Sequence, residues 1–177
     1  KNKKLYFDFF FRVTSTAAEF RDFVKDFWEI KERSQSISPQ DRERLTRTVD
    51  FLKDEIKDKD SFKNLDQKTY ERNHDLRRNV ERWAENIVNA SIDISKILLA
   101  SSKAKIPQTY KEVIQKLPVS LGFDENVAAS MAEFTKLRNI LAHEYLDLRF
   151  NEIKKFIDTM ERPYGYLVDY SVKILRE

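Results

Sequence analysis

The sequence predicts an all-α protein, and three observations indicate this class. Only two of the 177 residues are glycine and four are proline, which leaves little material for hairpins and tight strand turns. Lys, Glu, Arg, Leu and Ala, which all favour helices, are abundant. Apolar residues recur at spacings of three and four along most of the chain, as they do on one face of a helix. A chain of this length can form one domain with its own core.

Residues 1–37 are rich in aromatic side chains, and we expect them to form a helical extension that precedes the main domain. Thr16–Glu19 matches a capping box. The apolar residues that follow it are spaced as on an amphipathic helix, which we place at residues 17–33. Because the chain begins with lysine, we expect further protein upstream, and the segment is then either the tail of an upstream domain or an extension particular to this chain.

The main domain is expected to cover residues 38–177. Ser38 followed by Pro39 combines a cap with a proline at the first helical position, which marks a new helix. The apolar stripe of that helix consists of Leu45, Val49, Leu52 and Ile56. After a polar stretch, Asp66 is expected to cap a long helix that runs towards Ser101.

Two capping signals divide the middle of this domain. Thr109–Glu112 is a capping box that opens a short helix, which we expect to stop at Leu117-Pro118. The segment VSLGF then connects to a helix that starts near Asp124 and continues through residue 148.

The C-terminal part is expected to contain two further helices. One carries the apolar residues Ile153, Phe156, Ile157 and Met160. Pro163 and Gly165 are expected to interrupt the chain before a final short helix at residues 167–175.

Charge and composition limit the classes of function. The net charge of +3 comes from 33 basic and 30 acidic residues, so a nucleic-acid-binding surface would have to be a local basic patch. The chain has no cysteine, which excludes disulfides and thiolate metal sites. Its two histidines are too few for a histidine-rich metal site. No apolar run approaches the roughly 20 residues that cross a membrane, and we expect a cytoplasmic protein.

The stretch KLRNILAHEY, residues 136–145, places polar side chains at the end of an apolar helical stripe. On a continuous helix, Arg138 and Tyr145 fall within the stripe and His143 points nearly opposite. A guanidinium in apolar surroundings needs a carboxylate or a phosphate beside it. Asp93, which lies between two isoleucines, is our candidate partner for Arg138 or His143. The alternative is a purely structural Arg–Asp pair that bridges two helices.

Arg72, Arg78 and Arg82 form a candidate RNA-binding patch, because they are spaced mainly at helical intervals. The alternative is an ordinary exposed helix face. In that case the arginines are balanced by the neighbouring carboxylates of Asp66, Glu71, Asp75 and Glu81.

The spacing of Arg138, His143 and Tyr145 resembles the Arg-x4-His-x-Tyr signature of the HepT-like toxins in the HEPN superfamily. Three segments of the chain resemble segments of that family in the same order. They are NASIDISKILL, IPQTYKEVIQKL and FTKLRNILAHEYLDL, and the similarity covers about residues 42–160.

The resemblance implies a HEPN-type bundle of four to five helices that forms a homodimer with a composite cleft at its interface. It implies a metal-independent endoribonuclease without a cofactor, which acts on RNA as the toxin of a toxin–antitoxin pair. The implied partner is a minimal nucleotidyltransferase antitoxin that silences the toxin by attaching AMP to Tyr145. Asn139 matches a supporting active-site residue, and Asp93 occupies the acidic position of the second family helix. Residues 1–37 lie outside the resemblance, and a fused upstream nucleotidyltransferase is one candidate for their origin.

The chemistry of RNA cleavage suits these residues. RNA carries its own nucleophile, the 2′-hydroxyl, so a catalyst needs only proton transfer and charge stabilisation. We assign proton transfer to His143 and phosphate binding to Arg138. An alternative of another class is a non-catalytic dimerisation module that binds a nucleotide or a partner nucleotidyltransferase through Arg138. A purely structural helical adaptor would leave the pairing of Arg138 with His143 unexplained.

Overall fold

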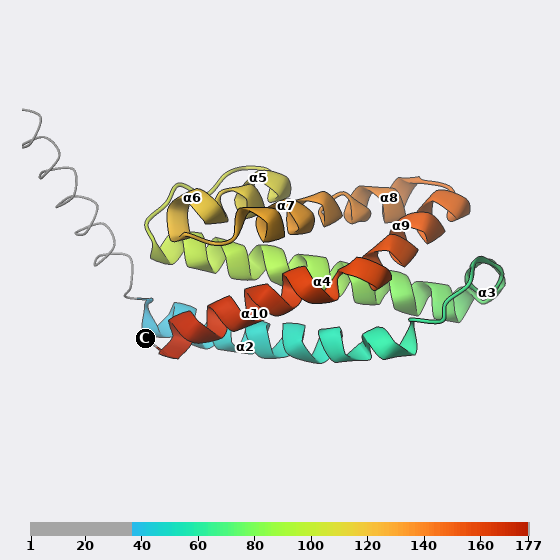
Figure 1. Ribbon diagram of the computed structural model, residues 1–177, viewed down its shortest axis with the longest axis horizontal. Helices are drawn as coiled ribbons and strands as arrows, with labels where there is room; N and C mark the ends of the chain where they lie inside the picture. The colour runs from blue at the N-terminus through green and yellow to red at the C-terminus, as the bar shows by residue number, and fades with distance from the viewer. Residues whose placement is uncertain (1–36, 177) are drawn as a thin grey trace, which may run out of the picture. The chain divides into compact units, whose positions relative to one another are not determined.

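The computed structural model describes residues 37–176, which fold as one compact unit. These residues contain α-helices and one 3-10 helix, and no strand (Figure 1). The all-α class predicted from the sequence is confirmed. The helix predicted at residues 17–33 lies outside the described residues.

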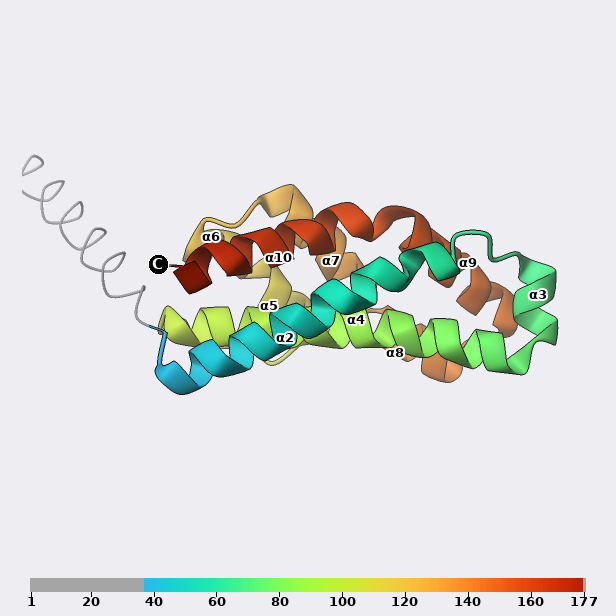
Figure 2. The same ribbon diagram turned by 90° about the horizontal axis from the view of Figure 1, so that it is seen from below.

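The long helix α4 lies between α2 on one side and α5, α7 and α8 on the other (Figure 1). Seen from below, α2 crosses α4, and α10 lies beside α2 (Figure 2). In chain order the elements are α2 (Pro39–Lys57), η1 (Asp58–Ser61), α3 (Gln67–Arg72), α4 (His74–Ser101), α5 (Tyr110–Gln115), α6 (Leu117–Leu121), α7 (Glu125–Phe134), α8 (Leu137–His143), α9 (Leu146–Thr159) and α10 (Glu161–Arg176).

Three predicted helix starts are confirmed, because each depends on a cap that is local in sequence. The side chain of Ser38 accepts a hydrogen bond from the N–H of Asp41 at 3.1 Å and opens α2. Thr109 forms the predicted capping box and opens α5. The side chain of Asp124 accepts a hydrogen bond from the N–H of Val127 at 2.9 Å and opens α7.

The long helix predicted to start at Asp66 is interrupted at Asn73. Asp66 caps only α3, by accepting a hydrogen bond from the N–H of Thr69 at 2.9 Å. Asn73 is extended, with φ −98° and ψ 95°, and its side chain accepts a hydrogen bond from the N–H of Leu76 at 3.0 Å. Since Asn satisfies the free N–H groups of a first helical turn well, this second cap ends α3 and opens α4.

The helix predicted from Asp124 through residue 148 consists of three helices. The first, α7, ends where the hydroxyl of Thr135 donates to the carbonyl oxygen of Ala132 at 2.7 Å. The second, α8, ends because Glu144 is extended, with φ −94° and ψ 164°. A helical wheel drawn on one continuous helix therefore misplaces the residues that follow each break.

The short helix opened by Thr109 stops at Gln115, just before Leu117-Pro118, as predicted, but the prediction that Pro163 interrupts the chain is wrong. Both prolines lie in the first turn of a helix, Pro118 in α6 and Pro163 in α10. The N–H groups of a first turn have no acceptor within the helix, so a proline there costs no hydrogen bond. Gly165 does not interrupt the chain either, because α10 continues through it. The helical segments are therefore more numerous than predicted in the middle of the domain, and the final helix, α10, is longer than predicted.

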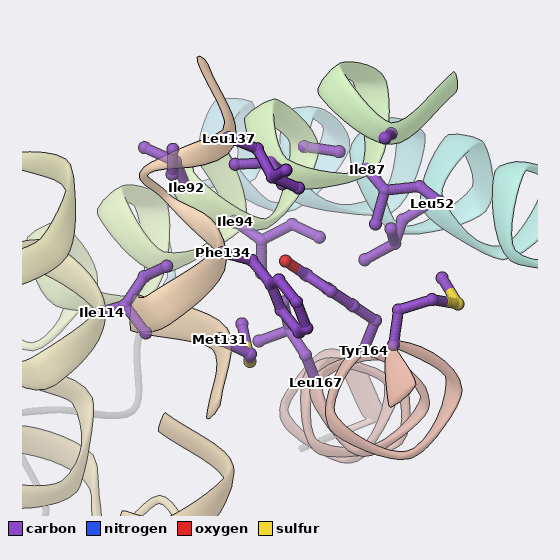
Figure 3. Packing of buried hydrophobic residues seen from close by; sticks show 14 of the residues in the cluster. Leu52, Ile87, Ile92, Ile94, Ile114, Met131, Phe134, Leu137, Tyr164 and Leu167 are labelled. Atoms are coloured by element: carbon purple, nitrogen blue, oxygen red, sulfur yellow. The ribbon is translucent and has the colours of Figure 1, made fainter. Parts of the chain in front are cut away.

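The core gathers side chains from α2, α4, α7, α8 and α10 (Figure 3). Tyr164 points from α10 into this cluster, close to Phe134 of α7 (Figure 3). Burial raises the pKa of Tyr164 far above its ordinary range. The ring of Phe156 meets those of Phe134 and Trp83 edge to face, at centroid distances of 5.0 and 5.6 Å. Such pairs each add about 0.5–1.5 kcal/mol beyond their buried area.

Trp83 and Asn86 also tie α4 to α2. The indole N–H of Trp83 donates to the carbonyl oxygen of Glu55 at 2.7 Å. The amide of Asn86 donates to the carboxylate of the same Glu55 at 2.9 Å. These two bonds hold the part of α4 against which α8 packs.

Candidate functional site

One side of the short helix α8 is buried and the other carries the candidate catalytic residues. Leu137 and Leu141 lie four residues apart and are both buried. Arg138 is half-buried, whereas Asn139 and His143 are exposed. The buried leucines thus anchor α8 and place the motif at the edge of the core.

Tyr145 lies just beyond α8 and is 82% exposed. The prediction that Tyr145 lies in the apolar stripe is wrong. Leu148, at the end of the same predicted helix, is also exposed, to 47%. The reason is the extended conformation of Glu144, which separates α8 from α9. The side chain of Tyr145 is consequently accessible from solvent.

Arg138 packs on an aromatic ring that the sequence analysis did not single out. Its Cζ atom lies 4.8 Å from the centre of the Tyr110 ring, and Nζ of Lys96 lies 5.0 Å from the same centre. Within residues 37–176, neither cation forms an ion pair with a carboxylate. Sequence alone could not identify Tyr110 and Lys96, because the three residues come from three different helices.

Asp93 is not brought together with Arg138 or His143. It forms no ion pair with either residue in the described part of the chain. The structural Arg–Asp pair considered as an alternative is therefore absent there. Asp93 lines a different groove, between α2 and α4, together with Arg47, Thr48, Phe51, Asn86, Asn89 and Ala90.

A second groove, of about 440 Å³, separates α4 from α8. Its α8 wall consists of Leu141 and Ala142, directly before His143. Its α4 wall carries Arg78 and Arg82, both exposed. The remaining lining residues are Asn79, Glu81 and Glu85.

Glu81, a carboxylate next to these arginines, is engaged elsewhere and does not balance their charge. Glu81 accepts a hydrogen bond from the hydroxyl of Tyr70 and lies 3.6 Å from the guanidinium of Arg149. Burial, and then this contact with Glu81, raise the pKa of Tyr70 above its ordinary range. Among the residues that the structure describes, neither Arg78 nor Arg82 forms an ion pair. Their positive charge therefore remains available to an anion in the groove.

Arg72 lies apart from Arg78 and Arg82. It belongs to α3, and the break at Asn73 separates it from the face of α4 that carries the other two. It lines a third hollow at the turn between α3 and α4, with Asp66, Lys68, Thr69, Asn73, His74 and Asp75. The three arginines consequently do not form one continuous helical row.

No three His, Asp or Glu side chains among the described residues gather closely enough to hold a metal ion. None of the described helices combines the length and the apolar character that crossing a bilayer requires.

The fold and the site define a class of protein: a helical bundle that presents an arginine and a histidine on one short helix, beside a groove with unpaired positive charge. The family model described as "Ribonuclease HepT-like" matches residues 52–164, and the chain belongs to this family. The match runs from α2 into the first turn of α10 and includes α8. It confirms the HEPN-type fold and supports ribonuclease activity. No curated protein matches the chain.

Proposed function

We propose that this protein is a metal-independent endoribonuclease that acts as the toxin of a HEPN toxin–antitoxin pair. Membership of a ribonuclease family supports the general activity. The observation that carries the proposal is the environment of the Arg138 side chain. Its guanidinium is half-buried beside a ring, without a carboxylate partner in residues 37–176, on the same short helix as the exposed His143.

The helical spacing of the motif supports a composite site between two subunits. Residues five positions apart on an α-helix are separated by about 140° around the axis and about 7.5 Å along it. Arg138 and His143 of one α8 therefore do not converge on a single phosphate. A second subunit related by a two-fold axis brings its own α8 to the same cleft, so that the arginine of one chain serves with the histidine of the other.

The proposed reaction needs no group beyond these side chains. An imidazole takes the proton of the 2′-hydroxyl, and the 2′-oxygen attacks the adjacent phosphorus. The bond from phosphorus to the 5′-oxygen breaks, and that oxygen takes a proton from the second imidazole of the dimer. Arg138 stabilises the charge on the phosphate oxygens through its paired N–H donors. Asn139, exposed one residue further on, is assigned a supporting role at the phosphate.

The accessibility of Tyr145 supports regulation by AMPylation. Its oxygen attacks the α-phosphorus of ATP, and pyrophosphate leaves. The attached group brings bulk and a negative charge close to the groove of Arg78 and Arg82, where it repels RNA. The enzyme we propose for this step is a minimal nucleotidyltransferase that acts as the antitoxin.

The test compares the two histidines of the chain. His143→Ala should lower the rate of RNA cleavage by at least about 100-fold, because proton transfer contributes 10²–10⁴-fold in enzymes. His74→Ala is the matched control and should cleave as the wild type does, because His74 is an exposed residue whose ring contacts Arg77. An RNA with hydrogen in place of every 2′-hydroxyl should resist cleavage, and a chelator should have no effect.

Two outcomes would overturn the proposal. If the deoxy substrate is cleaved, the nucleophile is not the 2′-hydroxyl. If expression arrests growth equally with His143→Ala and with the wild type, while neither cleaves RNA, the domain is a binding module and not a nuclease.

A further inference from the structure

The ring of Tyr110 holds two cations beside the candidate site. Arg138 comes from α8, Lys96 from α4, and Tyr110 is the first residue of α5. The capping box at Thr109 fixes the backbone immediately before Tyr110. The ring is 40% exposed, so its neighbourhood can be reached from solvent.

The two cations lie within about 10 Å of each other, because both lie close to 5 Å from the same ring centre. Charges of the same sign repel at this distance. The negative face of an aromatic ring attracts a cation and offsets part of that repulsion. In the described part of the chain no carboxylate pairs with either cation, and Asp93, three residues before Lys96, forms no ion pair with them. A bound anion would offset the rest of the repulsion between the two cations.

We infer that Tyr110 is a positioning residue for Arg138 and that Lys96 is a second phosphate-binding cation of the same site, an inference that rests on the proposed function. The ring restricts the orientation of the Arg138 guanidinium. The planar set of N–H donors of this group must meet the scissile phosphate in one orientation. Lys96 binds a neighbouring phosphate of the same RNA strand. The ring of Tyr110 carries this role, since its hydroxyl makes no hydrogen bond within residues 37–176.

The positioning role is tested by the initial rate of cleavage of total cellular RNA. Tyr110→Leu removes the ring and should lower the rate about tenfold, within the range that a cation–π contact supplies. Tyr110→Phe keeps the ring and should stay within about twofold of the wild type. Tyr166→Leu is the control, because Tyr166 is 38% exposed on α10, and it should cleave normally. Thermal unfolding of each variant verifies that it is folded.

The role of Lys96 is tested by binding of an uncleavable 2′-O-methyl RNA oligonucleotide of mixed sequence at several salt concentrations. Lys96→Gln should reduce the slope of log affinity against log salt by about 0.7, the value for one phosphate contact on a single strand. Lys173 is an exposed lysine of α10 that forms no ion pair in the described residues. Lys173→Gln should therefore leave the slope unchanged.

The outcomes separate this inference from the proposed function. A wild type that binds but never cleaves RNA refutes the nuclease and with it the positioning role of Tyr110, whereas the binding measurements still decide the role of Lys96. Cleavage by Tyr110→Leu at the wild-type rate, or equal losses in the Leu and Phe variants, overturns the positioning role. Equal salt slopes for Lys96→Gln and Lys173→Gln overturn the phosphate contact. If Tyr110→Leu does not fold, the Lys96 measurement carries the test, and a loss of more than about twofold in Tyr110→Phe overturns the assignment of the role to the ring.

Discussion

The backbone of one residue, Glu144, decides how the end of the motif is presented. Its extended conformation ends α8 at His143 and leaves Tyr145 outside the helix. The side chain of Arg149 supports this turn, because its Nε donates to the carbonyl oxygen of Glu144 at 2.8 Å. A residue that would lie in an apolar stripe on a continuous helix is therefore exposed, and its hydroxyl can be modified.

At the scale of a single residue, we predict that Tyr145→Phe yields a nuclease that the proposed antitoxin cannot silence by modification. The change removes only an exposed oxygen, so RNA cleavage should stay within about twofold of the wild type, as expected for a surface substitution. Co-expression with a minimal nucleotidyltransferase of the proposed kind should add adenylyl groups to the wild type and none to this variant, as read by intact-protein mass spectrometry.

Tyr166→Phe provides the control for that experiment, since it removes a tyrosine hydroxyl from α10, away from the motif. It should still be adenylylated. Adenylylation of Tyr145→Phe at the wild-type level would show that another side chain is the target.

Single backbone positions also decide where the shorter elements end. Gly122 follows α6 with φ 66°, a left-handed conformation that residues with a Cβ adopt only with strain. Gly165 lies inside α10, and an added Cβ there would meet no atom within 4 Å. Of the two glycines of the chain, Gly122 thus ends a helix, whereas Gly165 lies within one.

We therefore predict opposite effects for the two alanine substitutions on the free energy of unfolding. Gly122→Ala should lower it by about 1 kcal/mol, because alanine is strained at positive φ. Gly165→Ala should raise it by about 0.5–1 kcal/mol, because alanine is the better residue inside a helix. Urea denaturation measures both values. A change of the same sign in the two variants would contradict this account.

For the binding of RNA, the distribution of charge over the molecule matters more than the net charge. The net charge is only +3, yet tertiary contacts engage Glu81 and leave Arg78 and Arg82 unpaired in the described structure. Because α8 packs beside this part of α4, the unpaired arginines share a groove with the residues that precede His143. The fold thereby concentrates positive charge beside the motif.

On this basis we predict that Arg78→Gln with Arg82→Gln weakens RNA binding and reduces its dependence on salt. The slope of log affinity against log salt should fall by about 1.4, if each arginine contacts one phosphate of a single strand. The matched control replaces Arg162 and Arg176, two exposed arginines of α10, and should retain the wild-type slope. Fluorescence anisotropy with an uncleavable RNA measures both. Equal slopes in the two double variants would rule out the groove as the path of the RNA.

The all-α class, the caps at Ser38, Thr109 and Asp124, and the presence of an Arg-x4-His-x-Tyr motif were determined by the sequence alone. Helix propensity and capping depend on residues within one turn of each other, so the sequence pattern contains the information needed to predict them. The resemblance to HepT-like toxins likewise depended on local segments, and the family match over residues 52–164 confirmed it.

Only the tertiary structure decided what surrounds the motif. It placed Arg138 and Lys96 against the ring of Tyr110, directed Asp93 into a different groove, and engaged Glu81 with Tyr70 and Arg149. These contacts join residues from separate helices, and the breaks at Asn73 and Glu144 alter which faces of those helices meet. A pattern read along one chain cannot specify them, because they depend on how the helices pack in three dimensions.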